Sequence, residues 1–241
     1  MERLFVEIKK SQLGCYIDDV FVGCIMYADD VILISCSLTH MQCMLDICAN
    51  VAHIIDLKFN VNKSVALRFG KRYRVLCNPL TINDVKLAYV SDCNYLGVSL
   101  RSSKQLKCCF DDNKRQFYRS FNSIYSKIKA GNAELIGMHL IKSICIPMLM
   151  YGTDVAVLKS YDMKSLSLCI TLSILKMFRI NDLNNAAFIA AMFSIEPISD
   201  MIKKRQYKFV SSYVQTREGL TVYNRCFNAI FDVGHSNFYC I

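Results

Sequence analysis

The sequence contains no tryptophan and, in 241 residues, only three prolines and nine glycines. Glycine and proline are far scarcer than the about 12% of residues that average proteins devote to them. This scarcity excludes a collagen-like or linker-rich chain. It also disfavours a turn-dense all-β sandwich, because tight turns favour Gly, Asn or Pro. Hydrophobic residues make up 53% of the chain and charged residues 20%, a composition that excludes intrinsic disorder.

The chain also lacks a long apolar run. Its longest apolar stretches, Ile144–Tyr151 and Leu166–Ile174, are much shorter than the about 20 residues that a membrane-spanning helix needs. Residues 1–10 carry several charges and no apolar centre, unlike a signal peptide. We therefore expect a soluble intracellular protein that makes no membrane contact.

The 13 cysteines show no disulfide pattern, because their number is odd and no C-x-x-C pair occurs. We expect reduced, mostly buried thiols in a reducing compartment. Cys226, His235 and Cys240 have a spacing similar to the second half of a zinc knuckle. A structural zinc site needs four ligands, and no cysteine lies just upstream of Cys226, so we interpret this spacing as chance.

Short strands and helices occupy different halves of the sequence, which predicts an α+β fold. The first half contains one helix, for which Thr39 is the expected N-cap and Gln42 completes a capping box. The expected strands are Gln12–Ile17, Phe21–Tyr27, Val31–Ser35, Leu57–Val61, Val65–Phe69, Pro79–Ile82, Val85–Val90 and Tyr95–Leu100. The expected later helices are Gln116–Lys129, Ala133–Ile146, Lys164–Phe178, Asn185–Ser194 and Ile198–Thr216.

An acidic turn interrupts the most apolar strands of the first half. Asp29 and Asp30 lie between Phe21–Tyr27 and Val31–Ser35, two strands that are apolar enough to be buried on both faces. Two buried carboxylates would repel each other unless cations neutralised them, and Mg²⁺ is the natural partner of oxygen ligands. Two such ions about 4 Å apart could assist phosphoryl transfer. The alternative is a solvated hairpin tip, which is how we interpret the similar pair Asp18-Asp19.

Several blocks together resemble the reverse transcriptases of non-LTR retrotransposons, the LINE and jockey-like elements. Phe21–Leu33 resembles their catalytic Y-x-D-D hairpin, and Leu13–Ile17 resembles the stretch before it. Phe59–Ser64 is similar to the family's "FN..KS" block, and Asn94–Val98 to its "YLG" strand. The basic helix near Lys114–Lys129 is in the place of the family's thumb. Four blocks in the family's order are far more specific than one short motif.

The resemblance covers roughly residues 11–160. It implies a partial polymerase palm, made of an antiparallel sheet plus a helix, over residues 1–100. A thumb-like helical region would follow over residues 101–160, and a helical C-terminal region over residues 161–241. The implied activity is RNA-templated DNA synthesis in the nucleus, with an RNA template, a DNA primer and deoxynucleoside triphosphates.

The resemblance also assigns roles to single residues. Asp29 and Asp30 would bind the catalytic Mg²⁺, and Tyr27 would lie beside the primer end. Lys63 would lie near the phosphates of the incoming nucleotide, with an exposed loop lysine as the alternative. The family's "YLG" residues would support the primer strand, with ordinary strand packing as the alternative for Leu96; they are Tyr95, Leu96 and Gly97.

Several parts of the family's catalytic machinery are not found in this sequence. The family's palm needs a third carboxylate upstream of the hairpin, and none of the upstream acidic residues has that pattern: Glu2, Glu7, Asp18 and Asp19. The fingers and their Gly-Gln block are missing as well. We therefore expect the C-terminal part of a polymerase, with at most a weak Mg²⁺ site and no activity by itself. Two alternatives are a catalytically dead nucleic-acid-binding remnant and an α+β domain that binds protein.

Positive charge is concentrated after residue 100. The chain has a net charge of +9, and residues 101–129 contain eight Lys or Arg against two Asp. Arg115, Arg119 and Lys129 lie opposite the apolar stripe of the expected helix, so they would form an outward row. A row of this kind fits a nucleic-acid phosphate backbone, with a solvated helix face as the alternative. For Lys203-Lys204-Arg205, a solvated face and a nuclear-import-like signal both stay open.

Overall fold

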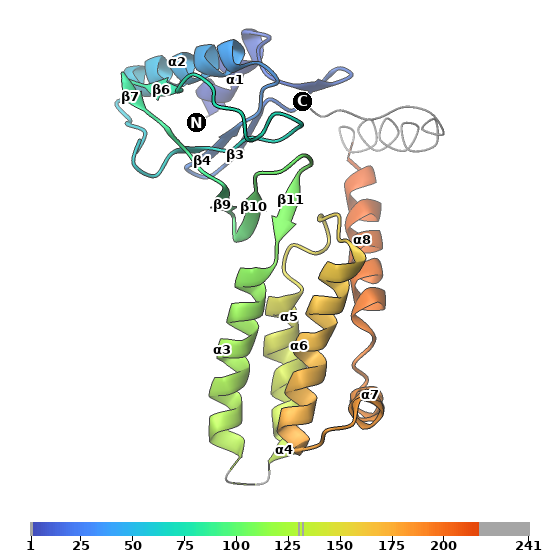
Figure 1. The fold of residues 1–241 in the computed structure, drawn as a ribbon. Coiled ribbons are helices and arrows are strands. Elements are labelled where there is room, and N and C mark those ends of the chain that lie inside the picture. Colours follow the sequence, from blue (N-terminus) through green and yellow to red (C-terminus); the bar gives the residue numbers. More distant parts are fainter. Residues whose placement is uncertain (1, 130, 132, 217–241) are drawn as a thin grey trace. The chain divides into compact units, whose positions relative to one another are not determined.

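The computed structural model describes residues 2–129, 131 and 133–216, and it shows an α+β fold. The described residues form two compact units. The first contains residues 2–93 and 101–106 together with 213–216, and the second contains most of residues 94–100 and 107–212. Short strands and two helices make up the first unit, whereas helices dominate the second (Figure 1). The expected fold class is therefore confirmed at this level.

The first unit contains several very small sheets. Three two-stranded antiparallel hairpins pair β1 with β2, β3 with β4 and β6 with β7, and one parallel pair joins β5 to β8. Within the described part of the chain, β3 and β4 pair only with each other. The elements are α1 (Glu2–Lys10), β1 (Tyr16–Ile17), β2 (Val20–Phe21), β3 (Cys24–Tyr27), β4 (Asp30–Leu33), α2 (Leu38–Ile54), β5 (Val65–Ala66), β6 (Thr81–Ile82), β7 (Val85–Lys86) and β8 (Ala88–Tyr89).

Helix α2 begins earlier than the sequence indicated. Its N-cap is Ser37, whose side-chain oxygen accepts a hydrogen bond from the backbone N–H of His40, so the prediction of Thr39 as N-cap is wrong. Gln42 consequently has a different role. Its amide donates to the Thr81 carbonyl at 2.9 Å and accepts from the Thr81 N–H at 2.9 Å. Gln42 therefore connects α2 to the backbone of β6 and does not cap the helix.

Helix α2 also organises the core of the first unit. Met44, Cys48 and Val51 pack with residues of α1, β2 and β3, and Leu45 belongs to a second cluster with residues of the β6–β7 region. The sequence analysis did not predict α1. Its buried residues Leu4 and Ile8 are four positions apart, and this short amphipathic spacing was the available signal.

Several expected strands are absent or shortened. Residues 57–61 form no strand, and the expected strand at Val65–Phe69 is only the two residues of β5. The expected turn at Asn83-Asp84 is confirmed: it joins β6 to β7, and both of its residues have positive φ. That backbone conformation suits Asn and Asp, which tolerate the left-handed region better than other side chains.

The expected strand Tyr95–Leu100 is wrong, because the chain reverses in its middle. Strands β9 (Asp92–Tyr95) and β10 (Val98–Arg101) are joined by Leu96 and Gly97, whose φ values are 47° and 78°. Two consecutive positive φ values are typical of a type I′ hairpin turn. Strand β11 (Lys107–Cys109) completes a three-stranded sheet of order β11-β10-β9.

The second unit confirms all five expected helical segments, with shifted ends. Its elements are α3 (Asp111–Ile128), α4 (Glu134–Leu140), the π-helical turn η1 (Ile141–Cys145), α5 (Ile146–Leu149), α6 (Ser160–Phe178), α7 (Leu183–Met192) and α8 (Ile198–Val214). The π-helical turn ends two residues before Pro147, which has no N–H to continue the regular helical hydrogen bonding. None of the helices in the described ranges is both long and apolar enough to cross a membrane.

One core holds these helices together. Phe117 and Phe121 of α3 are 0% and 2% exposed, and they pack with fully buried residues such as Met138 and Leu149. The core continues through Leu166 of α6 to residues of α8, and so runs across the expected boundary at residue 160.

The Leu96-Gly97 turn leads to a first prediction. A leucine in the left-handed region is strained, and asparagine is tolerated there. Leu96→Asn should therefore raise the free energy of unfolding by about 0.5–1 kcal/mol, as measured by urea denaturation. Leu100→Asn, within β10, should lower it. If Leu96→Asn destabilised the protein as much as Leu100→Asn, residues 95–100 would be an extended strand after all.

Candidate functional site

The acidic turn forms the tip of a hairpin, as expected. Strands β3 and β4 pair antiparallel with Tyr27 opposite Asp30, so Ala28 and Asp29 form a two-residue loop. The chain reverses direction at this loop, and Ala28 has a positive φ of 53°. The hairpin therefore brings together three of the residues named from the sequence, namely Tyr27, Asp29 and Asp30.

The tip is not buried, so the expected burial of this carboxylate pair is wrong. Tyr27 is 64% exposed, and both Asp29 and Asp30 are exposed. The strands have only one buried side, because Cys24 packs in the core while its neighbour Ile25 is 47% exposed. Solvated carboxylates need no cation to offset their repulsion, so burial gives no reason for a metal here. The arrangement matches the alternative of a solvated hairpin tip.

The residues present do not form a complete Mg²⁺ site. Over residues 2–129, 131 and 133–216, no group of three or more His, Cys, Asp or Glu side chains could hold a metal ion. Two exposed carboxylates supply only part of the six oxygen ligands that Mg²⁺ takes up. Asp18 and Asp19 form the loop of the neighbouring hairpin, β1–β2, and add no ligand to the pair. We therefore derive no chemical step through a metal in this chain.

The other residues assigned to nucleotide and primer lie in two different places. Lys63 is exposed in a turn closed by a 3.0 Å bond from its N–H to the Asn60 carbonyl. Within the described chain, no ion pair joins Lys63 to Asp29 or Asp30. Leu96 and Gly97 belong to the second unit and form the β9–β10 turn, with Tyr95 at the end of β9.

Packing accounts for the Leu96-Gly97 turn. The hydroxyl of Tyr151 donates to the Leu96 carbonyl at 2.8 Å, and a Cβ at Gly97 would come within 3.0 Å of the Tyr151 ring. Glycine is therefore required at position 97 by both its positive φ and the nearby ring. Asn113 fixes the Tyr151 backbone through a 2.9 Å bond from its amide to the Tyr151 carbonyl.

The basic row on α3 is exposed, as the periodicity predicted, but it is partly neutralised. Arg115 forms an ion pair with Asp112, and Lys114 forms one with Asp111 at 2.8 Å. Both acidic residues lie in the first turn of the helix, where the helix dipole favours them. Within the described ranges, no carboxylate pairs with Arg119 or Lys129, so the uncompensated charge of the row lies in its C-terminal part.

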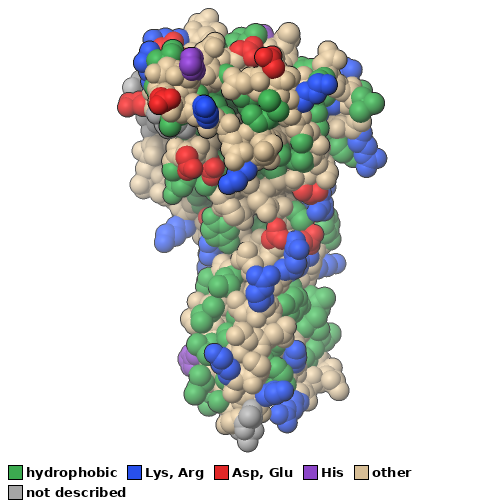
Figure 2. All heavy atoms as spheres, turned by 90° about the vertical axis from the view of Figure 1, so that its left-hand side faces the viewer, with side chains coloured by type: hydrophobic (Ala, Val, Ile, Leu, Met, Phe, Trp, Pro, Cys, Tyr) green, Lys and Arg blue, Asp and Glu red, His purple; other side chains and the backbone are tan. Residues whose placement is uncertain are grey.

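Lys176 of α6 adds a cation to the same face. Its ammonium donates to the Asn122 side chain at 3.0 Å and lies 5.1 Å from the centre of the Tyr125 ring. Nothing in the sequence of α6 links Lys176 to α3, because only the packing of the two helices joins them. Figure 2 shows Lys and Arg side chains spaced along the side of this unit that α3 forms, without a continuous basic patch.

The second basic cluster, on α8, is largely paired. Lys204 forms a 2.5 Å ion pair with Glu196, and Arg205 lies 3.8 Å from Asp154. The two interpretations of this cluster, a solvated face and a nuclear-import-like signal, both stay predictions. The triplet Cys226, His235 and Cys240 lies outside the described residues.

Sequence reasoning missed a further charged segment. Residues 57–83 contain six Lys or Arg and no Asp or Glu. The absence of any acidic residue from this run was the signal that the sequence offered.

Comparisons with known proteins add no relationship. No family model, no curated protein and no solved structure matches the chain.

The described cysteines include both buried and exposed thiols. Burial raises the pKa of the Cys24 thiol to about 11 and that of Cys145 to about 11. On α2, burial and the nearby Cys24 raise the pKa of Cys48 to about 12, whereas Cys43 on the same helix is exposed. The expectation of buried thiols is thus right for some positions and wrong for Cys36 and Cys43, which are both exposed.

A second prediction follows from Cys43 and Cys48, one exposed and one buried cysteine on the same helix, α2. Thiolates react with iodoacetamide, and a raised pKa keeps a thiol protonated at pH 8. Native protein should therefore be alkylated at Cys43 and spared at Cys48, as read by peptide mass spectrometry. Unfolding in urea should make the two rates similar. Equal rates in the native protein would contradict the burial of Cys48.

A third prediction concerns the acidic tip. A ligand that binds only the folded protein raises its Tm. We expect millimolar Mg²⁺ to leave the Tm of the chain unchanged, because the two exposed carboxylates lack further ligands. The double variant Asp29→Asn/Asp30→Asn is the control and should show the same Tm with and without Mg²⁺. A Mg²⁺-dependent rise that this variant abolishes would show that the tip binds the ion.

Proposed function

We propose that the chain is the C-terminal part of a non-LTR retrotransposon reverse transcriptase and that it binds nucleic acid without catalysis of its own. The sequence blocks support this proposal, since four of them occur in the order that the family has. The Y-A-D-D residues support it as well, because they occupy a hairpin tip. The partial palm and the thumb are part of the same proposal.

The observation that carries the binding function is the α3 face. Burial of Phe117 and Phe121 directs Arg119 and Lys129 away from the core, and Lys176 joins them from α6. Phosphate groups are the partners that such separated, exposed cations fit, since each contact releases counterions from the duplex. The partner that we propose is an RNA–DNA hybrid of template and primer.

We propose catalysis only for an intact reverse transcriptase that also has the third carboxylate. There, Asp29 and Asp30 would supply two of the metal-binding carboxylates that the resemblance implies. The described residues offer no third group for such a site. For this chain alone, we therefore propose binding and no templated synthesis.

A fourth prediction tests the α3 face. For each phosphate contact, log K should fall with log[salt] by about 0.9, which is about 3.5-fold in affinity between 50 and 200 mM salt. The double variant Arg119→Ala/Lys129→Ala should therefore lose up to about 12-fold less affinity over this range than the wild type does. The measurement is fluorescence anisotropy with a labelled RNA–DNA hybrid.

Arg115→Ala provides the internal comparison. Asp112 already neutralises Arg115, so this variant should change the salt slope less than Arg119→Ala does. Lys204→Ala, which removes a lysine paired with Glu196, is the control for nonspecific charge loss. If Arg119→Ala/Lys129→Ala kept the wild-type slope with its fold intact, the α3 face would be only solvated.

A further inference from the structure

We propose that the loop of residues 68–75, called here the Arg68 loop, is a second nucleic-acid contact that grips the phosphate backbone. It lies in the first unit and in the segment 57–83, which has no acidic residue. Its sequence contains four basic residues interspersed with aromatic and apolar ones, as Arg68-Phe69-Gly70-Lys71-Arg72-Tyr73-Arg74-Val75. None of these residues belongs to the α3 face.

The loop is fixed by its own first residue. The guanidinium of Arg68 donates to the carbonyl of Val75 and, at 2.9 Å, to the carbonyl of Arg72. These bonds tie the beginning of the loop to its end. Inside the loop, the N–H of Tyr73 bonds to the Gly70 carbonyl at 3.2 Å, and Gly70 has a φ of 103° that glycine permits.

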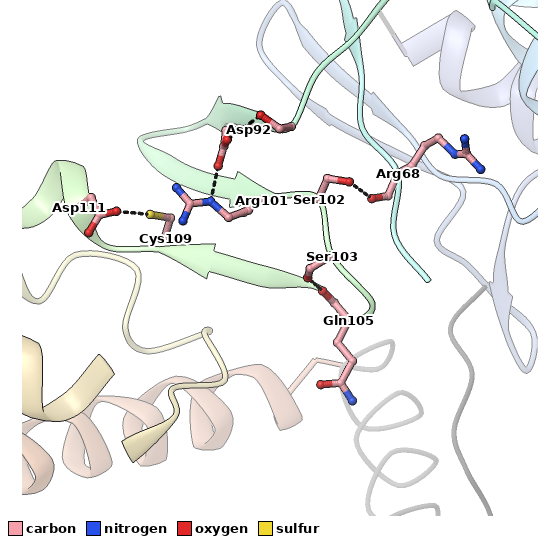
Figure 3. Close-up of polar contacts among 9 residues, drawn as sticks. Arg68, Asp92, Arg101, Ser102, Ser103, Gln105, Cys109 and Asp111 are labelled. Carbon is pink, nitrogen blue, oxygen red and sulfur yellow. Dashed lines mark hydrogen bonds and ion pairs between the residues drawn. The ribbon is translucent and has the colours of Figure 1, made fainter. Parts of the chain in front are cut away.

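Residues that follow β10 anchor the base of the loop. The Ser102 hydroxyl donates to the Arg68 carbonyl at 2.6 Å, and the N–H of Gly70 donates to the Ser103 carbonyl at 3.0 Å. In Figure 3 the Ser102 hydroxyl is directed at the Arg68 backbone, and the Arg68 side chain extends away from this contact. Ser102 and Ser103 thus hold the base of the loop, and the Arg68 side chain holds its end.

This framework presents cations to solvent. Lys71, Arg72 and Arg74 are exposed, and the Arg74 guanidinium lies 5.1 Å from the centre of the Tyr73 ring. In the chain that the structure describes, no carboxylate pairs with Arg72 or Arg74. Arg101 in the same unit differs, because it forms a 2.5 Å ion pair with Asp92. Arg72 and Arg74 therefore place positive charge without a carboxylate partner on an ordered backbone.

The chemistry of the loop favours nucleic acid over other anionic partners. Guanidinium groups offer planar pairs of N–H donors that match phosphate oxygens, and Tyr73 can hold the Arg74 plane in position. Ordering of the loop before binding reduces the entropy that binding must offset. The exposed Leu76, 98% accessible, follows the loop, but one leucine is too small an apolar surface for stable membrane attachment.

The test uses the same RNA–DNA hybrid and the double variant Arg72→Ala/Arg74→Ala. Two lost contacts should make the salt slope shallower by about 1.8, so the wild type should lose up to about 12-fold more affinity than the variant between 50 and 200 mM salt. Lys10→Ala in the same unit is the matched control, because Lys10 is already paired with Glu7. Its slope should equal that of the wild type. A wild-type slope in the loop variant would overturn the proposal.

A charge-preserving variant separates electrostatics from geometry. Arg72→Lys/Arg74→Lys keeps the charge but loses the planar donor pairs, so it should keep the salt slope and bind more weakly at every salt concentration. An affinity equal to that of the wild type would contradict the proposed geometry of the grip.

Two further comparisons distinguish the loop proposal from the α3 proposal and from binding to a membrane. If Arg72→Ala/Arg74→Ala reduces the slope and Arg119→Ala/Lys129→Ala does not, the loop is confirmed and the α3 proposal is wrong; the reverse result overturns the loop alone. If the wild type does not bind the hybrid at all, both fail. The second comparison measures sedimentation of the protein with phosphatidylserine vesicles. If the wild type sediments with the vesicles, Arg72→Ala/Arg74→Ala does not, and both bind the hybrid equally well, the loop binds a membrane surface and the proposal is overturned.

Discussion

Burial of the aromatic stripe of α3 is the constraint on which the second unit depends. Phe117 and Phe121 can leave water only by packing on the segment from α4 to α5 and on α6. This packing fixes the rotation of α3, and with it the outward direction of Arg119 and Lys129. It also brings α6 close enough for Lys176 to bond to Asn122. The hydrophobic core thus decides the electrostatics of the surface.

Ion pairs then determine which cations remain available. Arg115, Lys114 and Lys204 all have acidic partners, and exposed pairs of this kind stabilise a fold by little. Their effect on binding is larger, because a paired cation brings less net charge to a phosphate. The net charge of +9 is therefore a poor guide to the interface. Among the described residues, Arg72 and Arg74 of the Arg68 loop and Arg119 and Lys129 of the α3 face have no carboxylate partner.

Much of the architecture could be predicted from the sequence. Helical periodicity located all five expected helical segments of the second unit, and the acidic pairs located the loops of the β1–β2 and β3–β4 hairpins. The errors occurred where local preferences were ambiguous. An apolar residue before a glycine was interpreted as part of a strand at Leu96, although it forms a turn. Ser37 and Thr39 are both residue types that cap helices well, and it is Ser37 that takes the N-cap position.

The sequence alone determined the apolar stripe of α3, the basic residues opposite it and the acid-free run of residues 57–83, because these depend only on spacing and composition. Only the tertiary structure decided whether Asp29 and Asp30 are buried. Their strands pack on one side alone, so water reaches the tip and replaces the cation that burial would have required. Tertiary packing likewise decided the roles of Gln42 and Tyr151. Each bonds to a backbone group far away in the sequence, and no local pattern encodes such contacts.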